Sequence, residues 1–100
     1  MYKLIDIFNV KRNGNVVKSA EYKVLHTFET FDYDEETEGM LLSFAQSNGL
    51  KEGQYTVVEY KGDEPVAAVG QFYYDDDPYL DTAEWDNRVL ASVALGRNMI

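Results

Sequence analysis

The chain has 100 residues, of which 45% are hydrophobic and 27% charged, as expected for one ordinary globular domain spanning residues 1–100. It contains 18 acidic and 9 basic side chains, a net charge of −9, and no cysteine. These values exclude disulfides, zinc–thiolate sites and cysteine nucleophiles, and they argue against direct binding to the phosphates of nucleic acids.

The first 28 residues contain two β-rich runs with a turn signal between them. Asn13-Gly14 predicts a tight hairpin, because both central residues of a type I′ turn need positive φ. With that turn, Ile5 faces Tyr22, and Asp6 lies unfavourably opposite Glu21. The opposite face of the hairpin carries the apolar residues Leu4, Phe8, Val10 and Val17 and is too apolar to be fully solvated. It is therefore either partly covered by a helix or used as a contact surface.

Residues 33–48 are predicted to form a helix. Asp32 is the predicted N-cap residue, because Glu35 follows it three residues later, which is the spacing of a capping box. Several carboxylates lie in the first turns, where the helix dipole favours negative charge. Gly49 follows the last apolar position and supplies the left-handed residue at which helices commonly end.

A second hairpin is predicted from residues 54–61 and 66–74, which are β-rich and joined by the turn residues 62–65. Gly70 weakens the centre of the second strand and indicates a bulge or a close approach of another group.

The last quarter of the chain allows two interpretations. Asp81 and Glu84 have the spacing of a helix start, and residues 85–95 have a broad apolar face with Gly96 after it. The same residues also alternate as a strand does, and we favour the helix. The predicted order β-β-α-β-β-α makes an α+β domain, with an antiparallel sheet of about four strands and both helices against one face.

The sequence lacks the usual signatures of catalysis and of cofactor binding. His26 is the single histidine, and alternation places it with Tyr22 and Val24, so a half-buried strand residue is favoured over a catalytic one. No serine stands in a nucleophile-elbow motif, and no glycine-rich loop suits a phosphate. Three contiguous aspartates, Asp75 to Asp77, do not have the spacing of a calcium loop. We expect no enzyme activity, no cofactor and no dedicated metal site.

No segment has the pattern of a membrane span or of a secretion signal. The apolar runs are far shorter than the ~20 residues needed to cross a bilayer. Asp6 interrupts the apolar N-terminal stretch, which also lacks a small-residue cleavage site. We expect a cytoplasmic protein, in the producing or the infected cell, that does not contact membranes.

Charge is distributed very unevenly along the chain. Residues 1–23 carry five basic and two acidic side chains, whereas residues 24–100 carry four basic and sixteen acidic ones. Two stretches, 29–38 and 75–86, contain six carboxylates each and no lysine or arginine. Both stretches are threaded with aromatic residues and both lie at a predicted helix start. If the two helices pack on the same face, their acidic ends form one continuous negative surface.

This pattern favours a binding protein that recognises a basic surface of another protein. Carboxylates steer a basic partner, and tyrosine and tryptophan supply contact area. Small acidic proteins without cysteine that mimic DNA, many of them phage-encoded inhibitors, share this general character. The candidate partner-binding residues are Asp34, Glu35, Glu36, Glu38, Tyr74, Asp75, Asp76, Asp77, Tyr79, Asp81 and Trp85.

Three alternatives stay open at this point. Acidic surfaces commonly serve solubility alone, and acids at helix starts are ordinary dipole partners. The chain could be a structural module that forms a homodimer through the apolar second face of the first hairpin, or associates head to tail through its oppositely charged parts. It could also be an enzyme that uses carboxylates.

Overall fold

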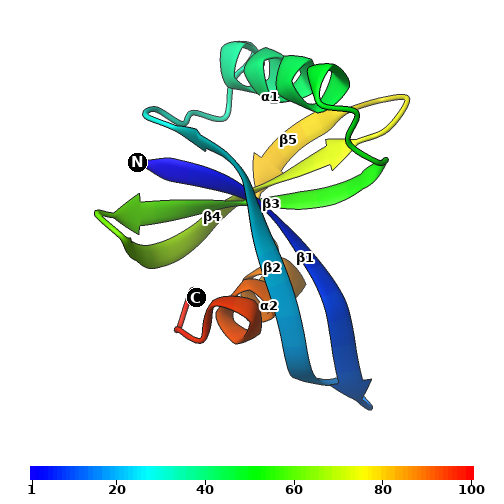
Figure 1. Ribbon diagram of the computed structural model, residues 1–100, viewed down its shortest axis with the longest axis vertical. Coiled ribbons are helices and arrows are strands. Elements are labelled where there is room, and N and C mark those ends of the chain that lie inside the picture. The colour runs from blue at the N-terminus through cyan, green and yellow to red at the C-terminus, as the bar shows by residue number, and fades with distance from the viewer.

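The computed structural model describes residues 1–100 and shows one antiparallel sheet with a helix on each side (Figure 1). Five strands lie in the order β2-β1-β3-β4-β5. The α+β class is confirmed, but the sheet has one strand more than predicted. The elements are β1 (Tyr2–Asn13), β2 (Val16–Phe28), α1 (Glu35–Ser47), β3 (Gly53–Lys61), β4 (Glu64–Tyr74), β5 (Tyr79–Thr82) and α2 (Trp85–Leu95).

The helices cover opposite faces of the sheet, and the prediction of both on one face is wrong. Leu4 is fully buried with Leu41 of α1, whereas its neighbour Ile5 is fully buried with Ala91 of α2. Consecutive strand residues point to opposite faces. The central strands carry adjacent apolar residues, so each face needs its own cover. Neither helix is long and apolar enough to cross a lipid bilayer.

The first hairpin turns one residue later than predicted. Its loop is Gly14-Asn15, and only Gly14 has positive φ (61°), which suits a type II′ turn with glycine in the first position. The register therefore moves by two residues, and Ile5 pairs with Val24. Asp6 now lies opposite Lys23, so the predicted clash of like charges is replaced by a favourable pairing.

The second hairpin confirms the two predictions made for Gly70. Val69 is an extra residue in β4, so the strand has a bulge directly before this glycine. A Cβ atom at position 70 would lie 2.7 Å from Cζ of Phe31 and 3.2 Å from the carbonyl oxygen of Asp81. The connection from β2 to α1 therefore crosses the sheet against β4 and β5, and it can approach this closely because position 70 has no side chain.

The interpretation of residues 85–95 as a helix is confirmed, and α2 ends at Gly96 with a left-handed φ of 68°. The predicted start at Asp81 is wrong. Residues 79–82 instead pair with the end of β4 as strand β5. Glu84 is the residue before the helix, and its side chain makes no capping hydrogen bond.

Candidate functional site

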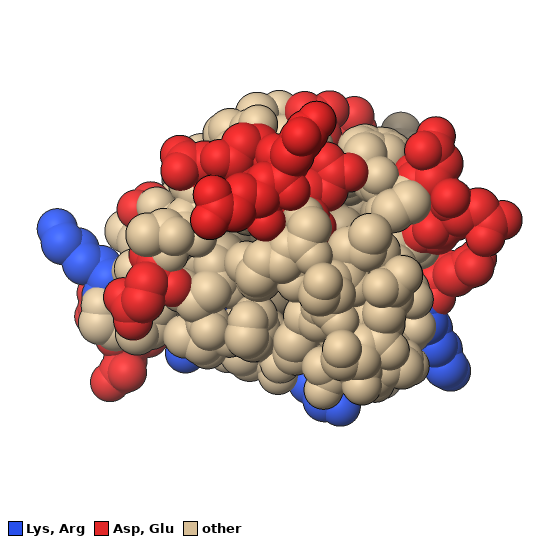
Figure 2. All heavy atoms as spheres, turned by 90° about the horizontal axis from the view of Figure 1, so that it is seen from above, with Lys and Arg blue, Asp and Glu red and all other residues tan.

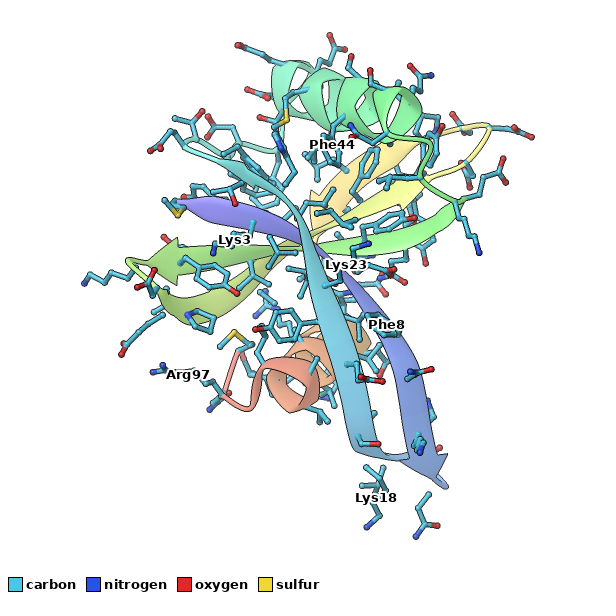
Figure 3. All side chains as sticks on the ribbon, in the orientation of Figure 1. Lys3, Phe8, Lys18, Lys23, Phe44 and Arg97 are labelled. Carbon is cyan, nitrogen blue, oxygen red and sulfur yellow. The ribbon has the colours of Figure 1, made fainter.

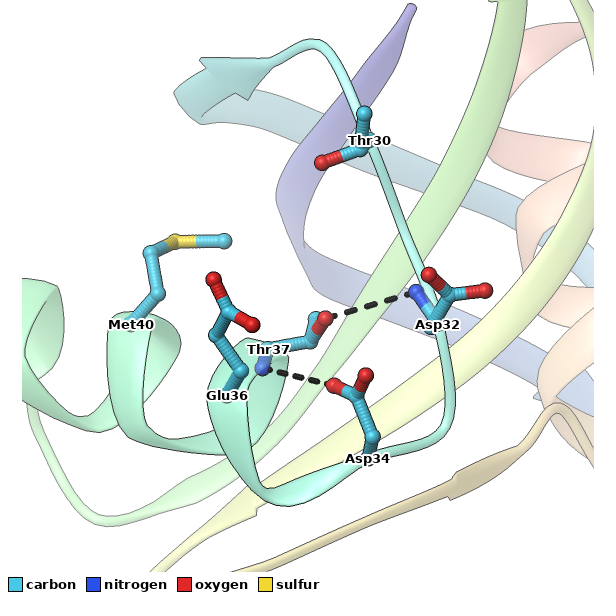
Figure 4. A pocket seen from close by; sticks show the side chains of 6 residues that line it. All are labelled: Thr30, Asp32, Asp34, Glu36, Thr37 and Met40. Carbon is cyan, nitrogen blue, oxygen red and sulfur yellow. Dashed lines mark hydrogen bonds between the residues drawn. The ribbon is translucent and has the colours of Figure 1, made fainter.

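The first acidic group lies at the start of α1. Asp34 is the N-cap residue, and Glu35, Glu36 and Glu38 follow in the first turn of the helix. A hollow of about 160 Å³ opens between this turn and the connection from β2 (Figure 4). Three of the side chains around it are carboxylates and none is basic: it is lined by Thr30, Asp32, Asp34, Glu36, Thr37 and Met40.

The helix begins two residues later than predicted because Asp34, not Asp32, caps it. The backbone N–H of Thr37 donates a hydrogen bond of 2.9 Å to Oδ1 of Asp34. The backbone N–H of Asp32 in turn donates to the Thr37 hydroxyl at 3.3 Å (Figure 4). Thr37, which is buried, thus ties the approaching chain to the first turn.

We expect Asp34→Ala to lower the thermal unfolding midpoint at neutral pH. The hydrogen bond from the Thr37 N–H is the main reason that the pKa of Asp34 lies below its ordinary value of 3.8. A carboxylate with a lowered folded-state pKa stabilises the fold above its unfolded pKa, and this stabilisation is lost as the pH falls through the folded-state pKa. The difference from the wild type should therefore shrink below pH 3.8.

Circular dichroism melts of both proteins at neutral pH and at about pH 3 measure this difference. Asp32→Ala removes a nearby exposed carboxylate that makes no side-chain hydrogen bond, and serves as the control. An equal, pH-dependent loss in the control would contradict the capping role of Asp34.

The second acidic group surrounds a pair of stacked tyrosines, Tyr73 on β4 and Tyr79 on the edge strand β5. The rings of Tyr73 and Tyr79 are 4.9 Å apart and inclined by 18°, and Tyr79 is 44% exposed. Partial burial raises the pKa of the Tyr79 phenol, and Tyr73, Glu84, Asp81 and Asp75 raise it further, in that order. The ring therefore lies in a negative field that comes from both ends of β5.

The three aspartates of the β4–β5 turn are all exposed. Asp75 accepts a hydrogen bond of 2.8 Å from the backbone N–H of Asp77, so its carboxylate closes the turn. The turn leaves the side chains of Asp76 and Asp77 directed to solvent, without a hydrogen bond or an ion pair.

Tyr33 connects the first acidic stretch to β4. Its hydroxyl donates a hydrogen bond to the carbonyl of Val69, the bulged residue of β4. Partial burial raises the pKa of Tyr33, Arg88 lowers it, and Tyr2 and Asp81 raise it. The phenol of Tyr33 is therefore within the field of a cation of α2 as well as of a carboxylate of β5.

The predicted single negative surface is not found. Figure 2 shows one group of carboxylates over α1 and a second at the end of the same face, with uncharged surface between them. Trp85 is 64% exposed but starts α2, on the other side of the sheet from α1. Tyr74 packs on the α1 side next to Phe72, whereas Tyr73 and Tyr79 point to the α2 side.

The carboxylates of both stretches have no basic partner within the molecule. The one ion pair of the structure joins Arg97 to Glu64 at 3.8 Å, and both residues lie outside the two stretches. No group of three potential ligands is placed to hold a metal ion. The acidic groups are therefore exposed charge that the fold leaves uncompensated.

His26 is half-buried, as predicted, but on the other face of the sheet. A bulge at Leu25 separates it from Val24, so it faces α1 and not the side of Tyr22. Its ring stacks on Phe44 at 4.4 Å, with an angle of 19° between the planes. This position makes it a packing residue of the α1 interface.

The apolar second face of the first hairpin is covered only in part. Leu4 is fully buried with Leu41 of α1, while Phe8 stays 39% exposed on the part of the hairpin that extends away from α1 (Figure 3). Val10 is 36% exposed but leaves this face, because the bulge between Phe8 and Lys11 sets it opposite Ala20. Lys18 lies near the far end of this hairpin, away from α1, whereas Lys3 and Lys23 lie near the middle of the sheet (Figure 3).

Glu84 belongs to the predicted acidic stretch 75–86 and Tyr73 to its aromatic residues, but the candidate binding residues chosen from the sequence left both out. The signal for both was the tyrosine-flanked turn, in which Asp77-Pro78 stands between two β-rich runs and so predicts a hairpin. No protein-family model, no curated protein and no solved structure matches this chain. The function is therefore inferred from the surface of the molecule.

Proposed function

We propose that this protein binds a basic surface of a partner protein, using its two acidic groups for attraction and Tyr79 for contact. The observation that carries the proposal is the absence of any ion pair for the carboxylates of the two acidic stretches. Uncompensated charge of one sign raises the rate at which an oppositely charged partner is captured. A surface that served solubility alone would do as well with charges of both signs interspersed.

The stacked tyrosines suit the centre of such a contact. Tyr79 is held against Tyr73 and against the edge of the sheet, so little conformational entropy is lost when a partner covers it. An aromatic face within a negative field also favours a guanidinium or ammonium group, which stacks on the ring while its charge meets the carboxylates. Arginine and lysine side chains of the partner are the groups this surface would select.

In its sharpest form, the proposal is that the partner uses the same basic surface to bind nucleic acid. Exposed carboxylates then compete with phosphates for the same lysine and arginine side chains, as an inhibitor or decoy would. We propose no catalysis, because the carboxylates lie on the open surface and not in an apolar cleft.

The test begins with the full chain as bait in a cell lysate, washed with increasing salt. A retained protein is then purified and bound to a labelled nucleic acid. The acidic protein is titrated into that complex. We expect the nucleic acid to be released. Formation of a ternary complex would contradict the decoy, and equal retention by a chain with Asp75→Asn and Asp77→Asn would contradict binding through the acidic turn.

A further inference from the structure

The two edges of the sheet differ in how they are protected against pairing with another strand. Strand β5 is four residues long and follows Pro78, and the carboxylate of Asp81 accepts the backbone N–H of Thr82 at 2.7 Å. Short length, proline and charge are the usual means by which an edge strand is blocked.

The edge formed by β2 is neither short nor interrupted by proline, and its charged side chains are of both signs. It spans thirteen residues without a proline, and residues 21–24 are exposed without a break. Tyr22 and Val24 are 41% and 39% exposed on the side of α2. An open edge next to exposed apolar side chains is a template for strand pairing.

The charges along β2 determine which strand would fit. Around Tyr22 the strand reads Glu21-Tyr22-Lys23, so an antiparallel copy centred on Tyr22 places Glu21 opposite Lys23 twice. The same register places Ala20 opposite Val24 and one Tyr22 opposite the other. Moving the centre to Glu21 or to Lys23 would instead bring two like charges together, which destabilises a strand pair.

We propose that the protein forms a two-fold symmetric homodimer in which the β2 strands of two copies pair in this register. The dimer would be one continuous sheet of both copies, with each Lys23 between Asp6 of its own chain and Glu21 of the second copy. Such an interface is isologous and closes, so it gives a dimer and not a filament. This inference does not rest on the proposed function.

The dimer would leave both acidic groups free. Strand β5 is at the edge of the sheet opposite to β2, so the two copies of β5 would lie at the far ends of the joined sheet. A partner with two basic surfaces could then be held at both ends, which raises the apparent affinity without a new contact.

Sedimentation equilibrium of the full chain at about 100 µM, well above a micromolar dissociation constant, tests the proposal. We expect a dimer for the wild type. Lys23→Glu and Glu21→Lys each convert two attractive pairs into two repulsive ones and should raise the dissociation constant at least about tenfold. Lys51→Glu makes the same charge change on an exposed loop residue outside β2 and should leave the dimer intact.

Mixing the two β2 variants makes the test specific for the register. Glu21→Lys presents two lysines and Lys23→Glu presents two glutamates, so the variants should form a heterodimer although neither dimerises alone. The Glu21→Lys variant also keeps Lys23 opposite Asp6, so it remains a valid test if Lys23→Glu folds poorly. A monomeric wild type, or mixed variants that stay monomeric, would overturn the proposal.

Discussion

Gly70→Val should lower the free energy of unfolding by about 1–3 kcal/mol, the usual cost of inserting a side chain into a filled site. A Cβ atom there would lie 2.7 Å from the ring of Phe31 and 3.2 Å from a backbone oxygen of β5. The ring cannot swing away freely, because it lies 5.5 Å from Tyr2 and 4.9 Å from Tyr33, measured between ring centroids. Urea denaturation followed by circular dichroism measures the loss.

Two further variants separate crowding from other effects at this position. Gly39→Ala places a methyl group where no atom lies within 4 Å, in the interior of α1, and should stabilise the protein by about 0.5–1 kcal/mol. The double variant Phe31→Ala with Gly70→Val should lose less stability than the two single variants lose together, because removing the Phe31 ring also removes its clash with the new side chain. Strict additivity would show that Phe31 does not limit the site.

Replacing Asp75 and Asp77 by asparagine should slow association with the basic partner by about tenfold at low ionic strength. These carboxylates lie at the turn beside Tyr79, and no basic side chain compensates them. The dissociation rate should change much less, because exposed charges act mainly on the encounter of the two proteins. Stopped-flow or surface-based kinetics at two salt concentrations would resolve the two rates.

The matched control removes two carboxylates elsewhere, with Glu59→Gln and Asp63→Asn. Asp63 lies in the β3–β4 loop, at the end of β4 far from the acidic turn, and the net charge changes by the same amount. An equal slowing in the control would assign the effect to net charge alone. The difference between the two variants should vanish at high salt, where screening acts over a few ångströms.

Much of the secondary structure could be predicted because its signals are local. The helix over residues 85–95 follows from apolar spacing and from Gly96, and the end of α1 from Gly49. Strand β5 was the element missed. Its four residues are too few to show a period, and the acids around it resemble a helix start.

The candidate site could be predicted only as a set of residues. The first turn of α1 follows directly from the sequence, because Asp34, Glu35, Glu36 and Glu38 are neighbours on one short segment. The pairing of Tyr73 with Tyr79 depends on a hairpin register that the sequence leaves open. The contact of Tyr33 with β4 depends on the path of a connection across the sheet, which local signals do not contain.

By itself, the sequence determined the α+β class, the main elements and the strong excess of exposed carboxylates, since hydrophobic period, turn chemistry and charge are local properties of the chain. Only the tertiary structure decided that the helices lie on opposite faces and that the acids form two separate groups. The physical reason is that adjacent apolar residues in the central strands, such as Leu4 and Ile5, require cover on both faces. Because each face is covered by one helix, the acidic start of α2 lies on the other side of the sheet from the acidic start of α1.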